Sequence, residues 1–370
     1  MNTIKVAMIG VGNISGIYLK NITETFKEVQ LIGVCDLVRE RAEKAQREYN
    51  IPKIYETMHD AFADPEVQII LNLTRPYEHF AVSHGALSAG KHVYSEKPLA
   101  ADLEEGKALL KLAKEKGLML GGAPDTFMGA GIQTCRRLID DGYIGTPIGS
   151  AAFMIGCGHE CWHPDPEFYY KRGGGPMFDM GPYYLTAMIN LMGGVDRVMS
   201  AARISYPQRV ITSQPQAGKV MDVEVDTYVA GTVQYASGAI GTIFTTFDTH
   251  YPRETSRVIE IYGSEGTLFV PDPNDFSGKI RLYRPEEGMV KEIPMTFGYP
   301  ENNRGLGLAD MAKALATGRA ARCDVQQTYH VLEIIEGFAS SAKNGCWTKI
   351  ESEYNRAPAM VRPVLKGILD

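Results

Sequence analysis

The first third of the chain alternates short apolar runs with segments whose apolar residues recur at helical spacing. The segments that read as strands are 4–9, 29–35, 67–73, 92–95 and 118–120. The helix-like segments between them are 17–22, 39–49, 79–89 and 103–116. Because parallel strands need crossover connections, this alternation predicts an α/β fold with a doubly wound parallel sheet.

Beyond residue 123 the pattern changes to a series of strands with few helices between them. The predicted strands are 148–155, 197–204, 227–235, 240–247, 258–262, 267–270 and 279–283. The predicted helices are 182–192, 308–317 and 328–343, and residues 236–239 read as a hairpin turn. Sequential strands predict an α+β domain with an open, mostly antiparallel sheet and one helical face. Apolar residues on both faces of this sheet favour a homodimer or homotetramer formed through it.

These two patterns divide the chain into two predicted domains. With 370 residues, the chain is longer than one hydrophobic core usually supports. We expect a dinucleotide-binding domain over 1–122 and a domain for substrate binding and oligomerisation over 123–370.

Composition narrows the classes of function. The net charge is −6 without a block of like charges, which argues against nucleic acid as a partner and favours a small polar substrate. No apolar run is long enough to span a membrane. The N-terminal residues lead directly into a strand, which predicts no signal peptide and a cytoplasmic location. The six cysteines are too scattered for a disulfide framework, so we expect reduced thiols.

A glycine motif follows the first strand, where residues 10–16 read Gly-Val-Gly-Asn-Ile-Ser-Gly. Gly10 permits a tight turn, and Gly12 lets the backbone approach a pyrophosphate. The helix that follows offers free N–H groups and the positive end of its dipole to that anion. Ser15 takes the usual third glycine position and is small enough for close packing of helix on strand. The predicted cofactor contacts of this loop are Gly10, Gly12, Asn13 and Ile14.

Asp36 ends the second strand and predicts which cofactor is bound. A carboxylate at this position accepts hydrogen bonds from the adenosine ribose hydroxyls and repels a 2′-phosphate, so NAD is favoured over NADP. Arg39 and Arg41 lie just beyond and soften this preference. We count Arg41 with Asp36 among the predicted cofactor-binding residues.

Further motifs, in the same order along the chain, resemble those of the glucose–fructose oxidoreductase and inositol dehydrogenase family (Gfo/Idh/MocA). They are Thr-Arg-Pro-Tyr-Glu-His at 74–79, Gly-Lys-His-Val at 90–93, Glu-Lys-Pro at 96–98, Gly-Gly-Gly at 173–175, Asp-Met-Gly at 179–181 and Gly-Ser-Glu-Gly-Thr at 263–267. The resemblance covers essentially the whole chain and implies NAD(P)-linked chemistry on sugars, polyols or related alcohols. It also implies cofactor contacts from Thr74, Pro76, His79, Glu96 and Lys97.

The resemblance implies catalytic roles for Lys97 and Asp179. In the family, the lysine of Glu-Lys-Pro reaches the reacting hydroxyl, where an ammonium stabilises developing alkoxide character. The family's acid/base pair is an aspartate followed four residues later by a histidine, but here Asp179 is followed by Tyr183. Because a neighbouring cation lowers the pKa of a phenol, we predict that Tyr183 transfers the proton. His159 and His163 are alternatives for this role, and Tyr183 as a core aromatic residue is another.

A second departure from the family lies at Asp125 and Thr126, where many relatives carry an asparagine and an arginine. These side chains are predicted to line the junction of nicotinamide and substrate, and they indicate a neutral, hydroxyl-rich substrate. Residues 162–172 are typical of a substrate loop, because aromatic faces stack on a pyranose ring. Their composition resembles that of family members that oxidise a ring hydroxyl of glycosides, such as the one at C3. The predicted substrate contacts are Asp125, Thr126, His159, Trp162, His163, Tyr170, Arg172 and Tyr183.

Residues 159–163 read His-Glu-Cys-Trp-His and match the HExxH pattern of zinc hydrolases. That chemistry needs a helix, and the glycines before the motif and the prolines after it argue against one. In an extended segment Cys157, His159, Cys161 and His163 share one face, which leaves a soft metal site as an alternative. We expect no metal.

The leading hypothesis is an NAD-dependent dehydrogenase of a sugar or glycoside. The alternative is an NAD-assisted glycoside hydrolase or lyase, in which oxidation at C3 acidifies the hydrogen at C2 and permits elimination of the aglycone. A third hypothesis is a dinucleotide-sensing regulator without enzymatic activity. The presence of Lys97, Asp179 and Tyr183 argues against the regulator.

Overall fold

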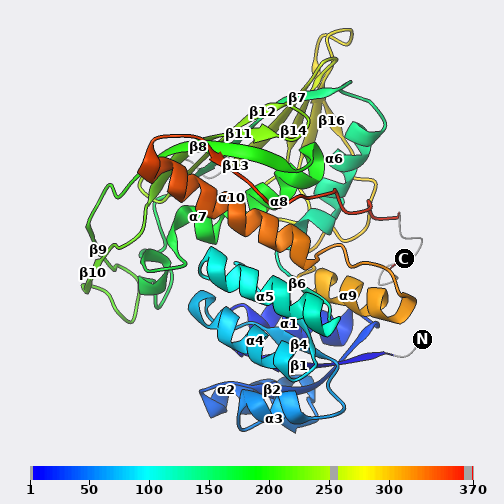
Figure 1. Ribbon diagram of the computed structural model, residues 1–370, viewed down its shortest axis with the longest axis vertical. Coiled ribbons are helices and arrows are strands. Elements are labelled where there is room, and N and C mark those ends of the chain that lie inside the picture. Colours follow the sequence, from blue (N-terminus) through cyan, green and yellow to red (C-terminus); the bar gives the residue numbers. More distant parts are fainter. Residues whose placement is uncertain (1–2, 251–256, 362–368, 370) are drawn as a thin grey trace. The chain divides into compact units, whose positions relative to one another are not determined.

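The structure is a computed structural model that describes residues 3–250, 257–361 and 369. The chain divides into two compact units, whose helices and strands are labelled in Figure 1. Unit 1 comprises residues 1–130, 296–329 and 357–370, and unit 2 comprises residues 131–295 and 330–356. The predicted assignment of cofactor binding to 1–122 and substrate binding to 123–370 stays a prediction.

Unit 1 contains a six-stranded parallel sheet with the strand order β3-β2-β1-β4-β5-β6. The strands are β1 (Ile4–Ile9), β2 (Val29–Cys35), β3 (Lys53–Ile54), β4 (Ile69–Asn72), β5 (His92–Ser95) and β6 (Leu120–Gly122). The helices are α1 (Ser15–Glu24), α2 (Arg39–Tyr49), α3 (Met58–Ala63), α4 (His79–Ser88), α5 (Leu103–Lys116) and α9 (Leu306–Thr317), with the 3-10 turns η1 (Pro76–Glu78) and η2 (Thr126–Met128). The predicted parallel sheet is confirmed, and its order reverses between β1 and β4, where such sheets bind dinucleotides.

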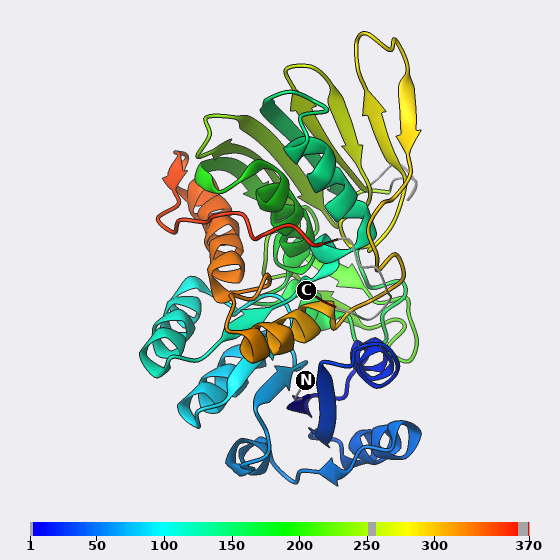
Figure 2. The ribbon, with the colours of Figure 1, turned by 90° about the vertical axis from the view of Figure 1, so that its right-hand side faces the viewer.

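Helices cover both faces of this sheet. Figure 2 shows α4 and α5 (cyan) on one side of the strands and α1 (dark blue) on the other. Every residue of β4 is buried, as expected for a parallel strand packed on both faces. This double burial explains why the central strands read as continuous apolar runs in the sequence.

A segment from the C-terminal half of the chain lies against the edge strand β6. The N–H of Gly122 donates to the carbonyl oxygen of Cys323, and Gly121 forms an isolated β-bridge with Asp324. A Cβ atom at Gly121 would lie 2.1 Å from the oxygen of Cys323, so this approach requires glycine. α9 also contacts β2 and β6, and it therefore forms part of unit 1.

Unit 2 contains a nine-stranded sheet with the order β16-β15-β14-β13-β7-β12-β11-β8-β17. The strands are β7 (Pro147–Ile155), β8 (Val195–Arg203), β11 (Tyr228–Tyr235), β12 (Ile240–Thr246), β13 (Arg257–Gly263), β14 (Thr267–Val270), β15 (Ile280–Tyr283), β16 (Val290–Ile293) and β17 (Thr348–Lys349). β7 and β12 are parallel, and the other neighbours are antiparallel. The predicted open, mostly antiparallel sheet and the hairpin between β11 and β12 are confirmed.

The helices of this part of the chain gather on one face of the sheet, as Figures 1 and 2 show. They are α6 (Ala130–Asp140), α7 (Gly175–Asp179), α8 (Gly181–Met192) and α10 (Val325–Asn344), with the 3-10 turn η3 (Glu167–Tyr170). Every residue of α8 is buried, which explains why its sequence is apolar on all sides. A separate two-stranded sheet, β9 (Gln208–Val210) and β10 (Val220–Asp222), was not predicted, because each strand has only three residues.

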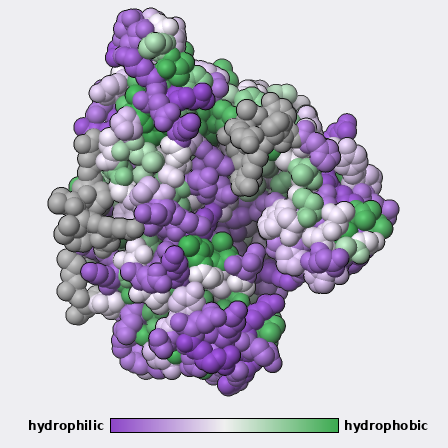
Figure 3. All heavy atoms as spheres, turned by 180° about the vertical axis from the view of Figure 1, so that it is seen from behind, coloured by the Kyte–Doolittle hydropathy of each residue, from purple (hydrophilic) through white to green (hydrophobic). Residues whose placement is uncertain are grey.

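The described helices include none that is both long and apolar enough to cross a membrane. Seen from behind in Figure 3, hydrophilic residues cover most of the lower end, where α2 and α3 lie. The predicted cytoplasmic location stays a prediction.

Candidate functional site

The loop between β1 and α1 has the shape that a pyrophosphate requires. Gly10 has a φ of +95°, and a Cβ atom there would lie 2.7 Å from the carbonyl oxygen of Leu73, so glycine is needed. A Cβ atom at Gly12 would meet nothing within 4 Å, which leaves open space above an exposed backbone. The Oγ of Ser15 donates to the carbonyl oxygen of Gly12 at 2.7 Å. The serine that replaces the third glycine therefore closes the turn with its own side chain.

Asp36 holds this loop from the end of β2. Its Oδ2 accepts the N–H of Val11 at 2.6 Å, and its Oδ1 accepts the N–H of Val38 at 2.8 Å. Leu37 and Val38 are exposed beside it, and so is Ile14. Exposed apolar side chains next to a carboxylate suit an adenosine, whose base is apolar on its faces and whose ribose donates hydrogen bonds. Leu37 and Val38 were missed, although apolar residues directly after the strand-ending acid are the signal.

Arg39 is already paired with carboxylates. Its guanidinium forms an ion pair with Glu43 at 3.1 Å and another with Glu56. These acids compete with any 2′-phosphate for Arg39, which strengthens the predicted preference for NAD. Arg41 is exposed two residues further along α2, and its contact with the cofactor stays a prediction.

His79 holds two loops of unit 1 together. It is fully buried, with Nδ1 2.7 Å from the carbonyl oxygen of Pro98 and Nε2 3.0 Å from that of Thr74. Burial lowers the pKa of His79. Because both ring nitrogens face backbone oxygens, the predicted contact of His79 with the cofactor would be indirect. Thr74 and Pro76 are half-buried in the loop that His79 holds, and they remain predicted contacts.

Glu96 fixes the backbone of Lys97 against α1. Its Oε1 accepts the hydroxyl of Tyr18 at 2.8 Å, and its Oε2 accepts the N–H of Lys97 at 3.0 Å. Glu96 is buried, and its predicted contact with the cofactor stays a prediction. Lys97 is half-buried just after β5, and its catalytic role stays a prediction.

Asp125 and Thr126 lie in the interior of unit 1, each with 1% of its surface exposed. The Oδ2 of Asp125 accepts the N–H groups of Gly305 at 2.8 Å and Gly307 at 3.0 Å. Asp125 therefore caps the N-terminus of α9, a task that the sequence did not predict. Burial raises the pKa of Asp125 to about 6. The contact of Asp125 and Thr126 with substrate stays a prediction.

In unit 2 the structure brings His159 to Asp179. Nε2 of His159 lies 2.7 Å from Oδ2 of Asp179, and Nδ1 is buried without a hydrogen-bond partner among the described residues. The rings of Trp162, Tyr169 and Phe247 surround the imidazole, with centroids 5.2, 4.0 and 4.7 Å away. A contact between a histidine and Asp179 is thus present, but its histidine comes from a turn before η3 and not from α8.

The other predicted residues of unit 2 lie in different environments. Tyr183 is on α8 and is 7% exposed, and its proton-transfer role stays a prediction. His163 is buried, and its Nδ1 accepts the N–H of Asp165 at 3.0 Å. Trp162 is 55% exposed, and Arg172 is exposed.

Tyr170 lies in the interior of unit 2, and its predicted contact with substrate stays a prediction. It has no exposed surface, and its hydroxyl donates to the carboxylate of Glu160. It belongs to the interior that supports the loop. The sequence did not indicate that Tyr170 is buried, because aromatic residues are common both in protein cores and in sugar-binding sites.

Residues 159–163 form a turn, with the N–H groups of Trp162 and His163 both directed at the carbonyl oxygen of His159. The prediction that the HExxH pattern is not helical is confirmed. The turn is not extended either, so the shared face that a soft metal site needs is not formed. Within the described ranges, no three His, Cys, Asp or Glu side chains are grouped so that they could hold a metal ion.

Comparison with known proteins supports the fold at the level of the whole chain. The model of the oxidoreductase family with an NAD-binding Rossmann fold matches residues 4–122, and the model of the GFO/IDH/MocA C-terminal domain matches residues 132–269. scyllo-Inositol 2-dehydrogenase (NAD(+)) of Bacillus subtilis is 26% identical over 72% of this chain and 73% of its own length. Levoglucosan dehydrogenase of Pseudarthrobacter phenanthrenivorans is 23% identical over 84% of this chain and 87% of its own length.

Solved structures share the fold over nearly the whole chain. Levoglucosan dehydrogenase in complex with NADH and L-sorbose has a TM-score of 0.81 at 19% identity and covers 95% of this chain and 99% of its own. An NAD-binding oxidoreductase from Klebsiella pneumoniae has a TM-score of 0.82 at 20% identity, with 94% and 99% covered. The glycine loop, Asp36 and the matches of both family models agree, and the chain belongs to the Gfo/Idh/MocA family of NAD-binding oxidoreductases.

Proposed function

We propose that the protein is an NAD-dependent dehydrogenase that oxidises a ring hydroxyl of a sugar or glycoside. The proposal is carried by the contact between His159 and Asp179, because it supplies the acid/base pair that the sequence lacks at Tyr183. The relatives support the substrate class, since they are dehydrogenases of scyllo-inositol, levoglucosan and D-xylose.

The chemistry assigns the proton to a particular nitrogen. With Asp179 ionised, Nε2 of His159 carries the hydrogen that the carboxylate accepts, which leaves the lone pair on Nδ1. Nδ1 is the nitrogen without a partner among the described residues, so we assign it the hydroxyl proton of the substrate. Asp179 stabilises the imidazolium that forms, and the ammonium of Lys97 stabilises the developing alkoxide.

The residues of unit 1 fit NAD. Gly10 and Gly12 leave space for the pyrophosphate, and Asp36 carries acceptors for the ribose hydroxyls. When bound, NAD accepts the hydride at its nicotinamide.

The aromatic side chains near His159 support a pyranose. Trp162 is 55% exposed, and the rings of Phe168 and Tyr169 lie 4.0 Å apart. Such faces stack on the apolar side of a sugar ring. We favour oxidation at C3 because residues 162–172 resemble those of glycoside-oxidising members of the family.

The first experiment follows NADH absorbance and product mass with purified protein, NAD and a panel of sugars, inositols and O- and C-glycosides. We expect NADH to rise together with a product that has lost two hydrogens. Release of aglycone at constant absorbance would instead assign NAD-assisted glycoside cleavage. Absence of any turnover across the panel would contradict both.

A pair of variants tests the acid/base assignment. We expect His159→Gln to lower kcat by about 10²- to 10⁴-fold, the usual contribution of a general base, and to leave the affinity for NADH unchanged. Tyr183→Phe should retain most of the turnover. The reverse outcome would assign the proton to Tyr183.

A further inference from the structure

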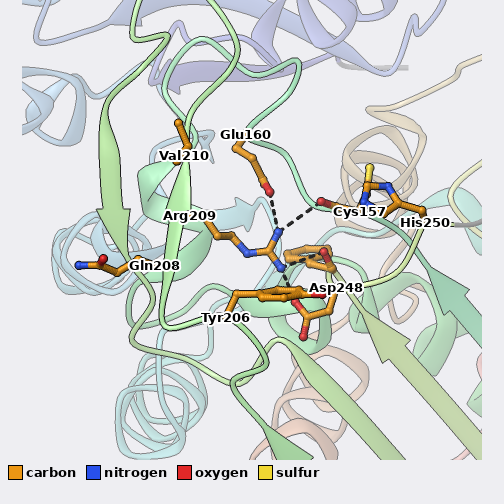
Figure 4. Close-up of a pocket in the computed structure, with 9 residues that line it drawn as sticks. Cys157, Glu160, Tyr206, Gln208, Arg209, Val210, Asp248 and His250 are labelled. Carbon is orange, nitrogen blue, oxygen red and sulfur yellow. Dashed lines mark hydrogen bonds and ion pairs between the residues drawn. The ribbon is translucent and has the colours of Figure 1, made fainter.

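A buried ion cluster lies beside the turn that carries His159. Its centre is Arg209 on β9, which is 8% exposed. Nη1 of Arg209 pairs with Glu160 at 2.5 Å, and Nη2 pairs with Asp248, whose side chain is 3% exposed. Figure 4 shows both carboxylates converging on the guanidinium. A charge this deeply buried is costly unless it is fully paired.

The same guanidinium also binds two backbone segments. Nη1 donates to the carbonyl oxygen of Cys157 at 3.3 Å, and Nη2 donates to that of Phe247 at 3.0 Å. Cys157 and Glu160 flank His159 in the sequence, and the ring of Phe247 packs against the imidazole at 4.7 Å. Arg209 therefore links the two segments that enclose His159.

Tyr170 extends this cluster to the backbone of His159. Its hydroxyl donates to Glu160 and accepts the N–H of His159 at 3.3 Å. The guanidinium of Arg209 lies over the ring of Tyr170, 5.1 Å from its centroid. Burial and the bond to Glu160 raise the pKa of Tyr170, so its hydroxyl stays protonated and keeps donating.

The hairpin β9–β10 supports the turn from the same side. The N–H groups of Thr212 and Ser213 donate to the carbonyl oxygen of Glu160 at 2.9 and 3.0 Å. Oγ of Ser213 donates to the carbonyl oxygen of His163 at 2.5 Å. The hairpin thus contacts the turn at Glu160 and at His163, and Arg209 is the charged residue of β9 that binds the same turn.

These contacts argue against a ligand as the partner of Arg209. A pocket of about 240 Å³ opens beside it, lined by Glu160, Asp248 and His250 among others. The guanidinium charge is already matched by two carboxylates, so Arg209 has little attraction to offer an anion in the pocket. The planar fork of arginine instead suits several acceptors in fixed directions.

We propose that Arg209 is a positioning residue for the acid/base pair, and that it holds the turn 157–163 so that Nε2 of His159 stays on Asp179. The inference rests on the proposed function, in which His159 takes the proton of the substrate. A base that is displaced by about 1 Å loses much of its effect, on the order of 10²-fold in rate.

The test uses Arg209→Lys, which keeps the charge but cannot bridge both carboxylates and both carbonyl groups. The matched control is Arg136→Lys on α6, another buried arginine of unit 2, which binds Asp140 at 2.6 Å and the carbonyl oxygen of Asn190 at 3.0 Å. We expect Arg209→Lys to lower kcat by about 10- to 100-fold without changing KM for NAD. The control should keep kcat within about 2-fold.

A direct readout separates positioning from general destabilisation. The imidazole of His159 is followed by NMR of the histidine-labelled protein across pH, with His159→Gln identifying its signal. We expect Arg209→Lys, and not Arg136→Lys, to shift the titration of His159, because its bond to Asp179 loosens. The ionisable groups packed around His159 and its turn are Asp179, Tyr169, Tyr170, Glu160, His163, Cys157, Cys161, Arg209 and Asp248.

The outcomes are distinguishable. An unchanged His159 titration in Arg209→Lys overturns the positioning role whatever the activity. A shifted titration together with full turnover in His159→Gln supports the positioning role and overturns the assignment of the base. An equal kcat loss from Arg209→Lys in the wild-type and His159→Gln backgrounds also overturns the positioning role, because the effects of coupled residues are not additive. If Arg209→Lys does not fold, Tyr170→Phe removes one bond of the same cluster, and the same shift is expected from it.

Discussion

Asp36 does two things with one carboxylate. It stabilises the glycine loop through the N–H of Val11 and stands where adenosine hydroxyls are expected. Substitution therefore acts on loop geometry as well as on cofactor choice. Glu96 likewise uses both carboxylate oxygens, because one accepts the hydroxyl of Tyr18 and the other accepts the N–H of Lys97.

Asp36→Ala should relax the preference for NAD over NADP. The carboxylate that repels a 2′-phosphate is lost, so the ratio of kcat/KM for NAD to that for NADP should fall by about 10-fold or more. Steady-state kinetics with both cofactors measure this ratio. Arg39→Ala is the control and should leave the ratio unchanged, because Glu43 and Glu56 already bind that guanidinium. A constant ratio in Asp36→Ala would refute the role of Asp36.

Asp125 makes the stability of the protein depend on pH. Burial raises its pKa from 3.8 to about 6, so the fold favours the neutral acid. The stability from this site is present below pH 3.8, falls as pH rises and is lost above about pH 6, a change of about 3 kcal/mol.

Asp125→Asn tests this dependence, because the amide oxygen still accepts from Gly305 and Gly307 but does not titrate in this range. Chemical denaturation at several pH values from 4 to 7.5 should show the wild type losing free energy of unfolding relative to the variant as pH rises. Parallel curves for the two proteins would exclude Asp125 as the titrating group.

At the scale of residues, the sequence predicts those parts of the candidate site that depend on position at a strand end and not on tertiary contacts. The glycine loop and Asp36 sit at strand ends, and the period of the sheet predicts where these are. The pairing of His159 with Asp179 was not predictable, because it joins a turn to a different helix through tertiary contacts. The capping role of Asp125 was not predictable for the same reason, since its partners Gly305 and Gly307 belong to a distant segment.

At the scale of elements, the length and the burial of a helix or strand determine whether the sequence predicts it. β5 (His92–Ser95) and α5 (Leu103–Lys116) begin and end at the predicted residues. β5 follows the turn at Gly90, and α5 has Asp102 and Gly117 as caps. β3, β9, β10 and β17 have two or three residues each. Segments this short carry no periodicity, so only tertiary contact determines them.

Tyr18 links two elements of unit 1, and Tyr18→Phe tests the link. Removing the hydroxyl leaves one buried oxygen of Glu96 without its donor, which should lower the free energy of unfolding by about 1–3 kcal/mol. Urea denaturation followed by circular dichroism measures the change. Tyr143→Phe, at an exposed tyrosine, should change it by no more than about 0.5 kcal/mol. Equal stability of the two variants would show that the bond to Glu96 contributes nothing.

At the scale of the whole molecule, unit 1 is assembled from three stretches of chain. α9 covers part of its sheet, and residues 323 and 324 pair with β6. Residues 1–122 alone should therefore lack both the helix that covers part of the sheet and the segment that pairs with its edge strand. The predicted homodimer or homotetramer through the nine-stranded sheet stays a prediction, which the exposed apolar residues Phe153, Met199 and Ile240 on its strands support.

A fragment of residues 1–122 tests this dependence. We expect it to melt without a cooperative transition and to bind NADH at least about 10-fold more weakly than the full chain, because the face that α9 buries is left open. Thermal circular dichroism and NADH fluorescence report the two properties. A fragment that melts cooperatively and binds NADH as the full chain does would show that residues 296–329 are dispensable for unit 1.

The split origin of unit 1 also has a consequence for synthesis. A ribosome makes the glycine loop first, yet α9 and the residues that pair with β6 follow residues 131–295 of unit 2. The nascent Rossmann sheet must therefore wait, with an apolar face uncovered, until residue 329 has emerged. During that interval the growing chain exposes apolar surface that only its later residues can bury.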